Sequence, residues 1–213
     1  MRRVVLLALL VLALPMAALA DDITLYNTGA AVLVSISGGL YTRGPATLTS
    51  FSDGTFSLSG HGIGSVMFGT GAFQGTNYLK SGTFSPTGSF FDVWGAGSAW
   101  KSLTGMPKYH GRVDLFQGVF EGPIQWNYLG KSGNQLDFEL VGQLSGTLWN
   151  GHEAYGTTTQ YFYETGKQWT AGKGCLSLGT TTVHSTTPEP GTLSLLGSGL
   201  VGIAGLFRRK KSA

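Results

Sequence analysis

Residues 135–141, which read QLDFELV, alternate between apolar and polar side chains. Successive side chains of a β-strand point to opposite faces, so the apolar residues share one face while Asp137 and Glu139 lie on the other. This pattern is typical of an antiparallel strand that buries one face and exposes the other to water. The segment therefore predicts a half-buried antiparallel strand.

The rest of the chain repeats this pattern in short runs at residues 31–36, 55–58, 112–116 and 158–163. No window between residues 21 and 183 has a convincing helical period. The pairs Asp53-Gly54 and Asn150-Gly151 predict two-residue hairpins, because a type I′ turn needs two residues with positive φ.

Many short strands favour two packed sheets over one open sheet with long exposed edges. We therefore expect an all-β domain at residues 21–178, built as an antiparallel β-sandwich or jelly-roll. A Thr/Ser-rich stretch at residues 179–187 predicts a flexible spacer after the domain.

The charge of the chain is concentrated at its ends. The formal net charge is +3, but six of the 14 Lys and Arg residues lie within residues 2–3 and 208–211. Residues 21–187 carry eight Lys and Arg against ten Asp and Glu, a net charge of −2. The basic character therefore gives no argument for nucleic-acid binding.

The N-terminus has the three parts of a secretory signal peptide at residues 1–20. Arg2 and Arg3 precede an apolar stretch of about 11 residues, and Ala18 and Ala20 form a small-residue cleavage site before Asp21. The apolar stretch is too short for the roughly 20 residues that span a bilayer. Signal peptidase is therefore expected to cut after Ala20, leaving the domain exported.

The single cysteine, Cys175, lies in the apolar run 175–178. One cysteine cannot form an internal disulfide, so the exported domain must be stabilised by packing. A small buried hydrophobic residue is the favoured interpretation, and a reactive thiol or an intermolecular disulfide is the alternative.

The C-terminus combines a proline-bounded motif, an apolar segment and a basic tail within residues 188–213. The motif is Pro188-Glu189-Pro190, the apolar segment at 191–207 predicts a short transmembrane helix, and the cations that follow are Arg208, Arg209, Lys210 and Lys211. The basic tail is expected to stay in the cytoplasm, which leaves the domain outside the membrane.

This order of features resembles the PEP-CTERM sorting signal. The resemblance implies a Gram-negative host, recognition of residues 188–190 by an exosortase, and transient anchoring in the inner membrane. It also implies transfer to the cell surface or to the exopolysaccharide matrix of a biofilm. An ordinary C-terminal membrane anchor is the alternative interpretation of residues 191–207.

No motif for catalysis or metal binding is visible in the sequence. The four histidines are scattered, and Gly156 stands where a zincin motif opened by His152-Glu153 would need its second histidine. The carboxylates of Asp92, Asp114, Glu121, Asp137 and Glu139 could serve a glycosidase, but charged residues on strands are usually solvated. The sequence thus predicts no catalytic residues, no metal and no cofactor.

Aromatic residues point to a binding role, because sugar rings stack on exposed aromatic side chains. The candidates are Trp94, Trp100, Trp126, Trp149, Trp169, Tyr155, Tyr161 and Tyr163. Trp126 and Trp149 lie in alternating patterns that predict an inner face, whereas Trp100 and Trp169 lie among Gly, Ser and Lys and are expected to be exposed. The sequence therefore favours a non-enzymatic surface or matrix protein with a structural, adhesive or glycan-binding role, and a secreted glycan-active enzyme is the alternative.

Overall fold

The computed structural model describes residues 22–34, 38–53, 56–96, 100, 112–165 and 173–185. This part of the chain is all-β, as the sequence predicts, and its strands pair antiparallel. The strands are β1 (Asp22–Val34), β2 (Gly39–Thr42), β3 (Ala46–Ser52), β4 (Ser57–Ala72), β5 (Gly82–Phe84), β6 (Phe90–Ala96), β7 (Arg112–Ser132), β8 (Gln135–Leu148), β9 (Glu153–Thr165) and β10 (Lys173–Ser185).

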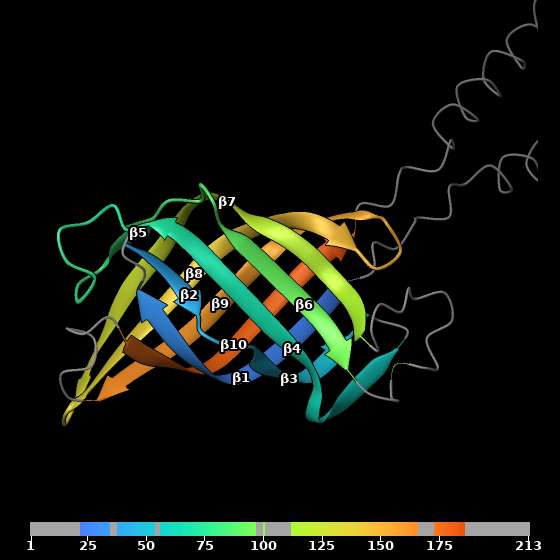
Figure 1. The fold of residues 1–213 in the computed structure, drawn as a ribbon, viewed down its shortest axis with the longest axis horizontal. Helices are drawn as coiled ribbons and strands as arrows, with labels where there is room; N and C mark the ends of the chain where they lie inside the picture. Colours follow the sequence, from blue (N-terminus) through green and yellow to red (C-terminus); the bar gives the residue numbers. More distant parts are fainter. Residues whose placement is uncertain are drawn as a thin grey trace, which may run out of the picture. The chain divides into compact units, whose positions relative to one another are not determined.

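The sheet closes on itself, so the prediction of a sandwich or jelly-roll is wrong. Strands β4, β6, β7, β8, β9 and β10 follow one another, and β10 pairs with β1 from Asp22↔His184 to Leu33↔Lys173. β3 completes the ring by pairing with both β1 and β4, which gives a barrel of eight strands (Figure 1). Closure removes exposed sheet edges. A sandwich was expected to solve this same problem of exposed edges.

The segment expected to be a flexible spacer is largely a strand. β10 runs to Ser185, and residues 179–185 pair with β9 on one side and, as far as His184, with β1 on the other. Thr181, Val183 and Ser185 are buried. The composition of this Thr-rich segment is that of a linker, yet the segment is a strand with every second side chain inside the barrel. Cys175 lies in the same strand and is only partly buried.

The strand around residues 135–141 is confirmed as part of β8. Phe138 and Leu140 are fully buried, whereas Asp137 and Glu139 lie on the outer face. A hairpin at Asn150-Gly151 joins β8 to β9, and Gly151 has the positive φ of 81° that the turn requires. Residues 149–152 form this connection, so the loop is longer than the predicted two residues.

The interior of the barrel is filled largely by aromatic rings. Trp126 is fully buried, stacks on Phe138 at 4.8 Å between ring centroids, and also contacts Phe162 at 5.3 Å. Its indole N–H donates to the carbonyl of Tyr78 at 2.7 Å, which satisfies its one polar group. The inner-face prediction for Trp126 is confirmed, and Trp149 packs partly buried against the same core.

The predicted signal peptide and transmembrane segment lie outside the described residues. Within the residues that the structure describes, no helix has the length and hydropathy needed to cross a bilayer.

Candidate functional site

Trp100, expected to be exposed for sugar stacking, lies in the core. It is only 2% exposed, its indole N–H donates to the carbonyl of Ile63, and its ring packs edge-on against Phe51 at 5.1 Å. The prediction is wrong because polar neighbours along the chain do not decide where a large ring packs. Trp169, the other expected stacking residue, lies outside the described residues.

The candidate carboxylates all lie on the outer face of four neighbouring strands, β6 to β9. They belong to Asp92, Asp114, Glu121, Asp137 and Glu139. Glu153, which was not among these candidates, lies on the same face, and the cations on these strands are Arg112 and Lys131. This part of the outer face is therefore acidic.

Two of these carboxylates are engaged by neighbouring polar groups. The amide of Gln135 donates to Asp137 at 2.6 Å, and the amide of Asn127 donates to Glu139 at 3.1 Å. A hydrogen bond with Glu139 also raises the pKa of Tyr161. Such contacts are those of an ordered polar surface.

Asp92 and Asp114 lie near each other on β6 and β7. Partial burial raises the pKa of Asp92, and the negative charge of Asp114 raises it further. Beside them, the guanidinium of Arg112 lies 5.4 Å from the ring centroid of Trp94.

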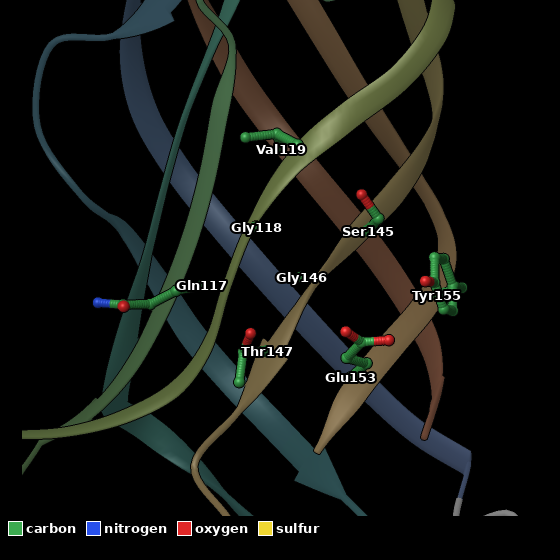
Figure 2. Close-up of a pocket in the computed structure, with 8 residues that line it drawn as sticks. All are labelled: Gln117, Gly118, Val119, Ser145, Gly146, Thr147, Glu153 and Tyr155. Carbon is green, nitrogen blue, oxygen red and sulfur yellow. The ribbon is translucent and has the colours of Figure 1, made fainter. Parts of the chain in front are cut away.

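An open hollow lies on the outer face of β7, β8 and β9 (Figure 2). It encloses about 350 Å³ and is lined by Gln117, Gly118, Val119, Ser145, Gly146, Thr147, Glu153 and Tyr155. Among the described residues that line it, Glu153 supplies the only carboxylate. A pair of carboxylates facing each other across a cleft, as a glycosidase needs, is therefore not found in this hollow.

Two paired glycines form the floor of the hollow. Gly118 on β7 is directly opposite Gly146 on β8. A Cβ at Gly118 would lie 2.6 Å from the ring of Phe116, and a Cβ at Gly146 would lie 2.2 Å from the carbonyl oxygen of Gln117. Glycine is therefore needed at both positions for the two strands to pass each other closely above the Phe116 ring.

The walls of the hollow combine apolar and polar surface. Val119, Ser145 and Tyr155 are neighbours across three strands, and Val119 and Tyr155 are 47% and 44% exposed. The hydroxyls of Ser145 and Thr147 lie beside them. An exposed ring next to short hydroxyl and amide side chains is the kind of surface on which a sugar can stack and form hydrogen bonds.

The sequence named Tyr155 only among many aromatic candidates and missed the hollow. The other residues that line the hollow come from separate strands and meet only through the pairing of β7, β8 and β9. It also missed the contact of His184 Nδ1 with Asp22 at 2.5 Å, which joins residues 162 positions apart and is largely exposed. No local pattern could have found either feature.

No group of three or more metal-ligating side chains occurs among the residues that the structure describes. The sorting residues, the cleavage site at residues 18–21 and the basic tail at 208–211 lie outside those residues.

Residues 186–210 match the family model of the PEP-CTERM protein-sorting motif. This chain carries a PEP-CTERM sorting motif. The resemblance inferred from residues 188–211 is thereby confirmed. No curated protein and no solved structure matches the chain.

The PEP-CTERM motif implies export, transient membrane anchoring and processing by an exosortase. The match begins at residue 186, directly after the last residue of β10. The sorting signal thus follows the barrel with almost no chain between them.

Proposed function

We propose that this chain is a non-enzymatic protein of the cell surface or exopolysaccharide matrix, sorted by an exosortase, whose barrel binds glycans. The PEP-CTERM motif supports the sorting step, and the outer hollow with Tyr155 supports the binding role. The apolar ring face of Tyr155 would stack on a sugar ring, while Ser145, Thr147 and Gln117 would exchange hydrogen bonds with its hydroxyls.

Calorimetric titration of the exported protein with soluble polysaccharides tests the binding role. We expect Tyr155→Ala to weaken binding about two- to tenfold, since one aromatic contact contributes about 0.5–1.5 kcal/mol. Tyr128→Ala is the matched control, because Tyr128 is similarly exposed at 40% but lies outside the hollow. Equal affinities of the two variants would contradict the assignment of the hollow.

The same samples address the alternative of a glycan-active enzyme. We expect no new reducing ends after prolonged incubation with any bound polysaccharide. Release of reducing ends that Glu153→Gln abolishes would establish the enzyme instead, with Glu153 as a catalytic residue.

Sorting is tested by replacing Glu189 with Gln and measuring the mature termini by mass spectrometry. We expect the variant to keep its C-terminal segment and to stay with the inner membrane. Unchanged processing would favour a passive membrane anchor.

A further inference from the structure

A strip of threonines lies beside the hollow, on the outer face of β9, β10 and β1. Thr157, Thr182 and Thr24 form one row across the three strands. Thr159, Thr180 and Tyr26 form the next row. These six residues together with Tyr155, which also lines the hollow, are called the Thr/Tyr strip below.

The threonines of the strip lie on the outer face, whereas the threonines between them on β9 and β10 lie on the inner face. Thr158 and Thr181 point into the barrel, where their hydroxyls lie 2.8 Å apart. None of the outer threonine hydroxyls has a hydrogen-bond partner within the described part of the chain. Each hydroxyl of the strip can therefore donate to and accept from a bound molecule.

Neighbouring strands are spaced about 4.8 Å apart and alternate residues on one strand about 6.7 Å apart. The strip is therefore a regular array of hydroxyl and methyl groups. Tyr155 and Tyr26 lie at opposite corners, two strand spacings apart across β10 and four residues apart along it. This places them on the order of 16 Å apart, a distance that several linked sugar rings would span.

The charge around the strip indicates which glycans fit. The strip contains no Asp, Glu, Lys or Arg, and the His184–Asp22 pair stands at one of its ends. The acidic outer face of β6 to β9 borders its other side. An anionic polysaccharide would be repelled there, whereas an uncharged chain would not.

We propose that the Thr/Tyr strip binds an extended, uncharged polysaccharide chain that runs from Tyr155 to Tyr26. This inference rests on the glycan-binding function proposed above and adds the class of glycan and a second contact site. Both tyrosines are about equally exposed, at 44% and 43%, so each can stack on a sugar ring of the same chain.

The test is a titration of the exported protein with cello-oligosaccharides from the disaccharide to the hexasaccharide, with hydroxyethyl cellulose and with alginate. We expect affinity to rise at least tenfold with oligosaccharide length, to change little with salt, and to be negligible for alginate. Tyr26→Ala and the double variant Thr180→Val, Thr182→Val should each reduce the affinity for the hexasaccharide fivefold or more. Thr83→Val on β5 is the control and should bind as the unaltered protein does.

The outcomes separate this inference from the proposed function. Disaccharide binding as tight as hexasaccharide binding, lost in Tyr155→Ala but kept in Tyr26→Ala, would overturn the strip and leave the hollow as the binding site. A preference for alginate would also overturn the strip. No binding to any of these glycans would overturn both proposals. Circular dichroism identifies a variant that fails to fold. If Tyr26→Ala fails to fold, the threonine double variant, which keeps the side-chain volume, decides whether the strip binds the glycan.

Discussion

Two parts of the barrel interior are built on different chemistry. One is the aromatic cluster around Trp126, in which rings from several strands pack within about 5–6 Å of one another. The other is a buried polar network in which Asn27 donates to Gln160 at 3.0 Å and Gln160 donates to Thr158 at 2.7 Å. The rings need only matching shape, whereas every polar group needs a partner at a fixed position. The network therefore favours one register of β1, β9 and β10, and the rings contribute a large buried apolar surface.

Removing a ring should have the largest effect. We expect Trp126→Ala to lower the free energy of unfolding by about 3–5 kcal/mol, because it leaves a cavity among packed rings and a carbonyl without its donor. Urea denaturation measures this change. Trp94→Ala on the outer face is the control, and an equal loss there would contradict the assigned importance of the ring cluster.

Crowding the polar network should have a smaller effect. A Cβ at Gly179 would lie 2.5 Å from Asn27 Oδ1 and closer still to Gln160 Oε1. We expect Gly179→Ala to lower the free energy of unfolding by about 2–3 kcal/mol, since the two amides must separate inside the barrel. Gly44→Ala, where a Cβ meets nothing within 4 Å, should change it by less than about 0.5 kcal/mol.

Glu164 differs from the residues of the polar network, whose side chains have hydrogen-bond partners, and its replacement should have the smallest effect of the three. Its side chain is 2% exposed, and neither carboxyl oxygen has a hydrogen-bond partner within the residues that the structure describes. We expect Glu164→Leu to raise the free energy of unfolding by about 1–2 kcal/mol, because the change removes a buried polar group without a partner. The exposed Glu121→Leu serves as the control. A stability loss in Glu164→Leu would contradict this expectation.

The sequence was sufficient to predict the strands but not their closure. Alternation at residues 135–141 shows which side chains are buried, and the structure confirms this in β8. It says nothing about whether β1 meets β10, because that contact joins residues 162 positions apart. A closed sheet and a sandwich bury the same alternating pattern, so both fit the same residues.

The amino-acid composition was misleading for the Thr-rich residues 179–185, which were predicted to be a spacer. Residues 179–185 read GTTTVHS, which has the composition of a linker, yet Thr181 and Ser185 are buried in β10. Threonine is β-branched and fits a strand well, so its abundance alone cannot distinguish a spacer from a strand that is paired on both sides. The hollow was out of reach for the same reason as closure, since Gln117, Ser145 and Tyr155 meet only through strand register.

The pairing of β1 with β10 has a consequence for the order of events during export. β1 begins directly after the segment predicted to be a signal peptide, and β10 ends directly before the sorting motif, so the barrel cannot close until residues 173–185 are available to pair with β1. Contacts between residues so distant in sequence form late and slowly. Closure of the barrel thus waits for the strand that directly precedes the sorting motif. A chain truncated before residue 173 would leave one edge of β1 and one edge of β9 unpaired and prone to aggregation.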